Sequence, residues 1–157
     1  MVTITKMESQ HLDRVKKLSV AEAQEPFVGL ICDILDRLNQ QTQPYLVLAD
    51  GKIVGFFLID RDYKSSYHDA SVQSLGLRKF FIDQAHQGQG YAKQALLQLA
   101  DLLRAEYPDY KDIYLTVNCK NSGAKSLYLK VGFKDSGALY LGGPSGPQHV
   151  LKQELMT

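Results

Sequence analysis

Residues Leu77 to Leu103, LRKFFIDQAHQGQGYAKQALLQLADLL, decide the fold of this chain. An apolar, aromatic run ends at Ile82, a short loop carries Gly88 and Gly90, and apolar residues then recur at helical spacing. The stretch therefore predicts a strand, a tight loop and a helix. Glycines let a ligand approach the backbone, and the first turn of a helix has unpaired N–H groups and a partial positive charge. This geometry favours phosphate binding.

The spacing of these glycines narrows the class of phosphate compound. A dinucleotide loop beginning at Gly88 would need glycine or alanine where Lys93 stands, and a P-loop would need Gly-Lys-Ser/Thr, which the chain lacks. Gln87, Gly90 and Ala92 instead match Gln/Arg-x-x-Gly-x-Gly/Ala. This pattern resembles the signature of the GCN5-related N-acetyltransferases (GNAT), in which the loop amides hold the pyrophosphate of acetyl-coenzyme A.

A second stretch, Asn121 to Phe133, resembles another signature of the same family. Its sequence, NSGAKSLYLKVGF, has an asparagine, a short helical pattern and then Tyr-x-x-x-Gly-Phe. Asn121 or Ser122 can cap the helix start, and Gly132 suits the left-handed position at its end. With two signatures in the expected order, the chain is identified as a member of this family, with specific motifs over about residues 77–133.

Length and composition favour one soluble globular domain, residues 1–157. The chain is 45% hydrophobic and 22% charged, and its 18 Lys and Arg against 17 Asp and Glu give a net charge of +1. Nucleic acid and membrane are therefore not expected partners. Cys32 and Cys119 are too isolated for a disulfide framework or a metal cluster, and no signal-peptide core is seen. We expect a cytoplasmic protein without a metal.

Hydrophobic periodicity predicts the element order β-α-α-β-β-β-α-β-α-β-β. Asp50-Gly51 is expected to form a two-residue hairpin turn, and Gly76 to mark a bulge or a close backbone approach. The resemblance implies a mixed α/β sheet with helices on both faces, whose two parallel central strands splay so that the cofactor enters between them. Strands are expected at 2–6, 45–49, 53–59, 72–82, 113–117, after 133 and near 149–154, and helices at 9–18, 27–38, 92–106 and 121–131.

The resemblance also implies which residues hold acetyl-CoA. Main-chain groups of residues 79–82 would pair with the pantetheine arm, and one amide there could polarise the thioester carbonyl. The loop amides would hold the pyrophosphate, and Asn121 would touch the pantetheine. The expected cofactor-binding residues are Phe81, Ile82, Gln87, Gly88, Gln89, Gly90, Tyr91, Ala92 and Asn121.

Two proton transfers are needed if the acceptor is an amine. A primary amine with a pKa of about 10.4 is only roughly 0.04% neutral at pH 7, so a base must accept a proton. Asp83, His86, His149 and ordered water remain alternatives for this base. Tyr128 holds the family position of the general acid that protonates the departing thiolate, and a neutral phenol suits that role.

Three functions remain open at this point. A small-molecule amine acetyltransferase leads, because the order of segments is similar to bacterial diamine and polyamine acetyltransferases. A protein lysine or N-terminal acetyltransferase and a non-catalytic acyl-CoA-binding module are the alternatives, although the module would not need Tyr128. A homodimer is common in such enzymes, but no residue demonstrates one. Five acidic residues could receive a polycation or be ordinary surface charges: Glu22, Glu25, Asp60, Asp62 and Asp69.

Overall fold

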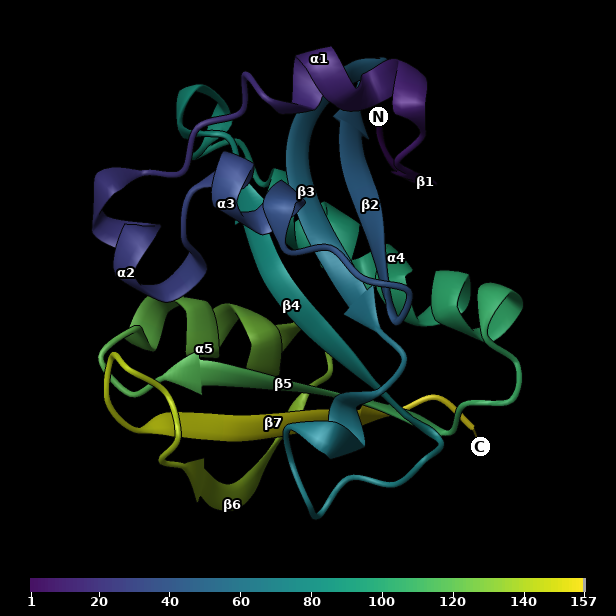
Figure 1. Ribbon diagram of the computed structural model, residues 1–157, viewed down its shortest axis with the longest axis vertical. Coiled ribbons are helices and arrows are strands. Elements are labelled where there is room, and N and C mark those ends of the chain that lie inside the picture. The colour runs from purple at the N-terminus through teal and green to yellow at the C-terminus, as the bar shows by residue number, and fades with distance from the viewer. Residues whose placement is uncertain (157) are drawn as a thin grey trace. The chain divides into compact units, whose positions relative to one another are not determined.

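The computed structural model describes residues 1–156, and Figure 1 shows its elements. Its strands are β1 (Val2–Lys6), β2 (Thr42–Ala49), β3 (Lys52–Asp60), β4 (Ser74–Ile82), β5 (Asp112–Asn118), β6 (Lys134–Tyr140) and β7 (Gln148–Glu154). Its α-helices are α1 (Leu12–Val15), α2 (Glu25–Val28), α3 (Ile31–Asp36), α4 (Tyr91–Glu106) and α5 (Ser122–Lys130). The strands form one seven-stranded mixed sheet in the order β1-β2-β3-β4-β5-β7-β6, which confirms the predicted fold class.

The chain divides into two compact units, of which the first comprises Met1–Asp60 and Leu77–Gln98. In this unit β1, β2 and β3 pair antiparallel. The predicted hairpin turn is confirmed, because Asp50 and Gly51 have φ of 51° and 82°, as a type I′ turn requires. Apolar residues from the helical segments pack on this sheet; the core cluster includes Val15, Ile31, Ile34, Leu46, Phe56, Leu58 and Phe81.

The helices before β2 are shorter than their apolar periodicity predicts. The expected helix over 27–38 is interrupted, because Gly29 at φ 93° ends α2 and α3 begins only at Ile31. The expected helix over 9–18 is a 3₁₀ turn, Ser9–His11, followed by the single-turn α1. Packing against the sheet explains both cases, because short pieces can bury the same apolar residues as one continuous helix.

Strand β4 contains two special positions, only one of which the sequence predicted. At Gly76 the close approach is confirmed, since a Cβ there would overlap the ring of the buried Tyr63. The backbone irregularity lies at Lys79 instead, whose φ of 58° is rare for a residue with a side chain. A lysine in the sequence is not a signal for a positive φ, so the sequence could not predict this conformation.

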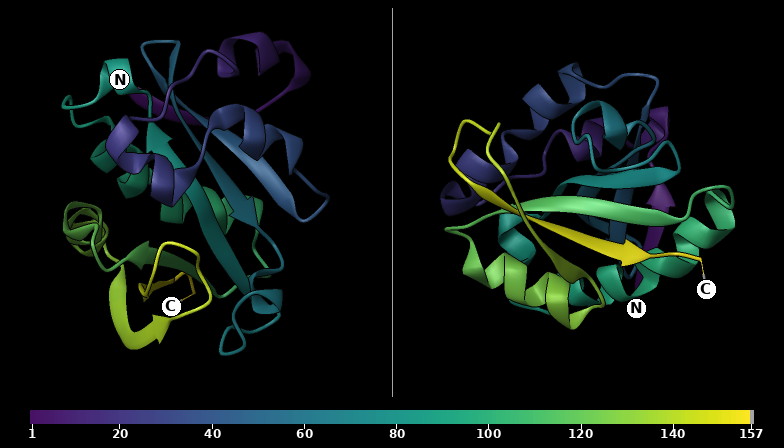
Figure 2. Two further views of the ribbon diagram at one scale, coloured as in Figure 1. Left: turned by 60° about the vertical axis from the view of Figure 1, so that its left-hand side comes forward. Right: turned by 90° about the horizontal axis from the view of Figure 1, so that it is seen from below.

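The second unit comprises Arg61–Gly76 and Leu99–Thr157. The start of β4 pairs with β5 through Ser74–Gly76 and Asp112–Tyr114, in the parallel orientation that the crossover rule predicts. The segment around the 3₁₀ turn Tyr63–Ser65 contributes to a tyrosine-rich cluster, and α5 contacts β5 and β6 (Figure 2). Splay of the central strands, and one domain over 1–157, stay predictions.

No helix within residues 1–156 combines the length and apolar character needed to cross a membrane.

Candidate active site

The loop between β4 and α4 leaves its main-chain donors available to a ligand. Gly88 and Gly90 have φ of 80° and 79°, values that glycine adopts without steric cost. Within residues 1–156, the N–H groups of Gly88, Gln89 and Gly90 donate to no protein acceptor. A Cβ at Gly88 would meet nothing within 4 Å, so the space in front of the loop is open.

The first turn of α4 is also suited to an anion. It contains no acidic side chain, whereas helix starts usually favour one, and it carries Lys93. A cation beside the positive end of a helix dipole is unfavourable unless an anion lies nearby. The loop and the first turn therefore fit a diphosphate.

Side chains of the loop hold its shape and leave the backbone free. The Gln87 Nε2 group donates to the Ile82 carbonyl at 3.1 Å and to Gln24 Oε1 at 3.0 Å. The Tyr91 hydroxyl donates to Gln89 Oε1 at 3.0 Å. Phe81 and Ile82 are buried at the end of β4, so the structure brings Phe81, Ile82 and residues 87–92 together in the first unit.

Asp83, a candidate base, is engaged within the protein. It is 8% exposed; its Oδ1 accepts from the Ser19 N–H at 2.7 Å, and its Oδ2 lies 2.9 Å from His86 Nδ1. The carboxylate thus ties the segment before α2 to the loop. The His86 Nε2 atom has no protein partner in the described part of the chain. Spacing could not predict the contact with Ser19, which spans 64 residues.

Of the two predicted caps of α5, Asn121 and Ser122, the structure shows Asn121 as the cap. Its Oδ1 accepts a hydrogen bond from the Ala124 N–H at 3.3 Å. Gly132, at φ 115°, follows the end of the helix. The Asn121 Nδ2 group has no protein acceptor among residues 1–156, and it remains available to a ligand.

Tyr128 lies on α5 with its ring edge-on to Phe133, at a centroid distance of 5.8 Å. The side chain is half-buried, and its hydroxyl makes no hydrogen bond within residues 1–156; because no buried side-chain polar atom there lacks a partner, this hydroxyl is in contact with solvent. Burial raises the pKa of the Tyr128 phenol well above its usual value of 10. The hydroxyl is therefore protonated at neutral pH and free to donate. Asn121 caps the helix α5 that carries Tyr128, and both residues belong to the second unit.

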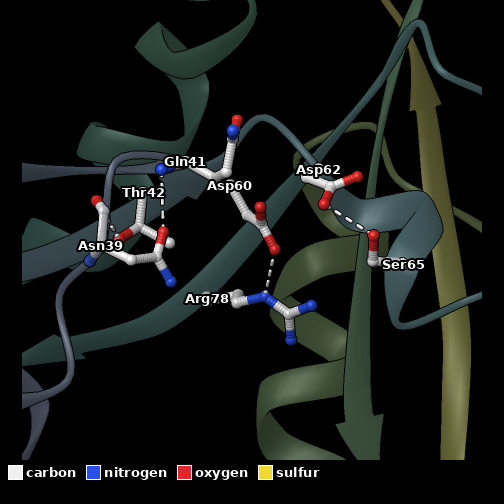
Figure 3. Close-up of polar contacts among 7 residues, drawn as sticks. All are labelled: Asn39, Gln41, Thr42, Asp60, Asp62, Ser65 and Arg78. Atoms are coloured by element: carbon white, nitrogen blue, oxygen red, sulfur yellow. Dashed lines mark hydrogen bonds and ion pairs between the residues drawn. The ribbon is translucent and has the colours of Figure 1, made fainter.

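The remaining predicted residues are the candidate base His149 and the five acidic residues that could receive a polycation. His149 on β7 is half-buried and faces Val117 and Leu139 in the strand register. Two of the five acidic residues are engaged, since Asp60 binds Arg78 Nε at 2.8 Å and Asp62 accepts from Ser65 Oγ at 2.6 Å (Figure 3).

The second unit also contains a pocket that the sequence did not predict. It has a volume of about 690 Å³, and among the predicted residues Asp69 lines it. Other lining residues are Tyr67, Tyr114, Lys134, Lys152 and Glu154. Its mixture of both charges and aromatic rings favours no single class of ligand. Within residues 1–156, no group of three or more His, Cys, Asp or Glu side chains is placed to hold a metal ion.

Comparison with known proteins identifies relatives of this chain. A family model described as Acetyltransferase (GNAT) family matches residues 8–133. A protein of Bacillus subtilis (strain 168), described as uncharacterized N-acetyltransferase YbbJ, is 30% identical over 130 residues, which cover 80% of this chain and 81% of that protein.

Solved structures of similar fold include two acetyltransferases. The aminoglycoside acetyltransferase AAC(6')-Ib, in complex with coenzyme A and kanamycin, superposes with a TM-score of 0.80 at 18% identity, over 98% of this chain and 95% of that chain. A spermidine N-acetyltransferase SpeG chimera from Vibrio cholerae and hSSAT has a TM-score of 0.72 at 17% identity, over 98% and 95%. At these identities the likeness shows the fold. The family match and the Bacillus relative show more, and the chain belongs to the GNAT acetyltransferase family as an N-acetyltransferase that uses acetyl-CoA.

Proposed function

We propose that this enzyme transfers the acetyl group of acetyl-CoA to a primary amine of a small molecule, by direct attack in a ternary complex. The main support is the set of unengaged N–H groups at Gly88, Gln89 and Gly90, which lead into a helix start without acidic residues. Such an arrangement suits the pyrophosphate of coenzyme A better than any group of the protein itself.

Main-chain groups of the first unit would hold the cofactor. The amides of residues 87–92 would bind the pyrophosphate, and the backbone at Phe81 and Ile82 would pair with the pantetheine arm. The positive φ at Lys79 supports this, because an irregular residue interrupts strand pairing and frees neighbouring main-chain groups for other partners. When bound, acetyl-CoA supplies a thioester that is activated toward amines.

The side chains proposed for catalysis handle protons. Tyr128 would donate to the leaving thiolate, since its hydroxyl makes no hydrogen bond within residues 1–156 and burial of the ring raises the pKa of the phenol. For the proton of the amine, His86 Nε2 is available and both oxygens of Asp83 are engaged, so His86, His149 or ordered water remain the stronger candidates. Cys119 is an exposed free thiol, and direct transfer does not require it.

The alternative functions differ in the acceptor that receives the acetyl group, or in having no acceptor. A diamine or polyamine would use exposed acids such as Glu22 and Glu25, because Asp60 and Asp62 are already engaged. A protein lysine or N-terminal amine, and a non-catalytic acyl-CoA module, are the other two. A cytoplasmic location and a homodimer remain expectations from the sequence and from the family resemblance.

The test is release of free thiol from acetyl-CoA with panels of polyamines, amino acids, aminoglycosides and peptides. We expect acceptor-dependent release with at least one small amine. Release with peptides alone would support protein acetylation and overturn the small-molecule proposal. Calorimetric binding of coenzyme A without release by any acceptor would support the non-catalytic module.

Asn121 offers a test that separates helix capping from cofactor binding. Asp caps as well as Asn but has no amide donor, whereas Ala lacks both, at a cost of about 1 kcal/mol of stability. We expect N121D to unfold in urea like the native chain but to bind acetyl-CoA several-fold more weakly. We expect N121A to lose both stability and affinity. If N121D retains full affinity, Asn121 is a cap and not a cofactor ligand.

A further inference from the structure

The loop between β4 and α4 is attached to a segment of the first unit that is distant in the sequence. We call this segment, residues 19–24 before α2, the strap. The Ser19 N–H donates to Asp83 Oδ1 at 2.7 Å, and the Ser19 carbonyl accepts from the Gln84 N–H at 2.8 Å. Val20 is buried and belongs to the core cluster, so the strap is itself fixed to the body of the unit.

Asp83 fixes the start of the loop through all of its hydrogen-bonding groups. Its N–H donates to the Val54 carbonyl of β3 at 2.7 Å, and its own carbonyl accepts from the His86 N–H at 2.8 Å. The two carboxylate oxygens contact the Ser19 N–H and His86 Nδ1, at 2.7 and 2.9 Å. A buried carboxylate is costly unless it is hydrogen-bonded, so this residue is committed to holding its neighbours in place.

Gln87 makes the second attachment, directly before the glycines of the loop. Its Nε2 group donates to Gln24 Oε1 at 3.0 Å and to the Ile82 carbonyl at 3.1 Å. One side chain thus joins the strap, the end of β4 and the loop. Residues 88–90, whose N–H groups make no hydrogen bond within residues 1–156, follow at once. Their glycines would otherwise let the backbone adopt many conformations.

We infer that Asp83 and Gln87 are positioning residues for the diphosphate, and that the strap acts on cofactor affinity through them. The inference rests on the proposed function and adds to it a role for side chains that do not touch the diphosphate. A ligand that must first order a flexible loop binds more weakly, because ordering the loop opposes binding. With the loop held against the strap, its N–H groups keep their directions before the ligand arrives.

The experiment compares two acetyl donors that differ in the diphosphate. Acetyl-CoA contains it, whereas S-acetylpantetheine ends before it, and thiol release from each is measured with the same amine acceptor. We expect the kcat/KM of the native chain to be at least about 100-fold higher for acetyl-CoA, and we call this ratio the donor preference. Because both donors are tested on the same sample, loss of folded protein in a variant cancels in the ratio.

Three variants of these contacts are informative. Asp83→Ala should lower the donor preference at least about tenfold, because it removes both carboxylate contacts and displaces the loop. Gln24→Ala should lower it about threefold, since it removes one hydrogen bond of the strap and leaves Asp83 unchanged. Asp83→Asn keeps an acceptor for Ser19 and places a donor beside His86 Nδ1, so it should retain most of the preference.

Asp60→Asn is the matched control. Asp60 is as buried as Asp83 and lies in the same unit, but its carboxylate binds Arg78 and not the loop. It should leave the donor preference unchanged. A native preference in Asp83→Ala or Gln24→Ala, an equal loss in Asp60→Asn, or an Asp83→Asn variant as impaired as Asp83→Ala would overturn the inference and leave the proposed function intact.

Two further outcomes concern the proposed function itself. Equal use of both donors by the native chain would show that the loop does not hold the diphosphate, and this would remove the basis of the inference as well. Absence of thiol release from acetyl-CoA with every amine would overturn the proposed acetyl transfer, and the inference with it.

Discussion

Replacing Gly90 with valine is expected to lower the affinity for coenzyme A by at least about 100-fold. At φ 79°, a β-branched residue is strongly disfavoured, so the loop would shift and turn its N–H groups away from their present directions. Each hydrogen bond to a charged group contributes about 1.5–3 kcal/mol, and loss of two such bonds corresponds to roughly 10² to 10⁴ in affinity. Isothermal titration calorimetry with coenzyme A measures this change directly.

The control for Gly90 is Gly51, which has a similar φ of 82° in the β2–β3 turn of the same unit. Gly51→Val introduces comparable backbone strain away from the loop. We expect it to lower the melting temperature without changing the affinity for coenzyme A. Native affinity in Gly90→Val, or an equal loss in Gly51→Val, would show that the loop amides do not hold the diphosphate.

Replacing Tyr128 with phenylalanine is expected to lower kcat by about 10²- to 10³-fold, in the range of general acid catalysis, and to leave the Kd of acetyl-CoA unchanged. The hydroxyl makes no protein hydrogen bond within residues 1–156, so its removal should not reduce stability. A lower kcat with an unchanged melting temperature would therefore show that the hydroxyl acts in the acetyl-transfer step and not in folding. Single-turnover thiol release separates this step from product release.

The pH dependence of kcat tests the same residue. Burial disfavours the charged phenolate and raises the pKa of Tyr128, so the phenol stays protonated through the neutral and moderately alkaline range. We therefore expect no loss of kcat from Tyr128 deprotonation below about pH 10. A descending limb near pH 8 that disappears in Tyr128→Phe would contradict this expectation.

Tyr110→Phe is the control for the loss of a phenol. The Tyr110 hydroxyl donates to the Arg61 carbonyl at 3.4 Å, in the same unit as Tyr128. We expect its kcat to match that of the native chain. If Tyr128→Phe also keeps native kcat, Tyr128 is a packing residue beside Phe133, and ordered water or another group protonates the thiolate.

Local sequence was sufficient where neighbouring residues determine the backbone. The strand, loop and helix around residues 87–92 were predicted, because three local signals indicate the same structure over one short stretch. These signals are the spacing of apolar residues, the glycines of the loop and the start of the helical pattern. The turn at Asp50-Gly51 was predicted for the same reason, and so was a cap at Asn121 or Ser122, of which Asn121 is the one observed; each feature depends on residues within three positions.

Sequence reasoning failed where distant residues compete with local preference. The predicted helix over 27–38 is interrupted at Gly29, a glycine at φ 93° that ends α2; this local stop signal was present in the sequence, but the apolar period outweighed it in the prediction. The positive φ of Lys79 has no signal in the sequence, because lysine does not favour that conformation. The role of Asp83 as a tie to Ser19 was likewise hidden by the 64 residues between them.

The sequence by itself indicated the family, the glycine loop between β4 and α4 and the position of Tyr128 on α5, because spacing along the chain specifies main-chain geometry over one or two turns. Only the tertiary structure decided which donors remain free and which acids are already paired. Asp60 and Arg78 belong to β3 and β4, and only folding brings their charges to within 2.8 Å. Contacts of this kind depend on how helices pack on strands, which no local pattern encodes.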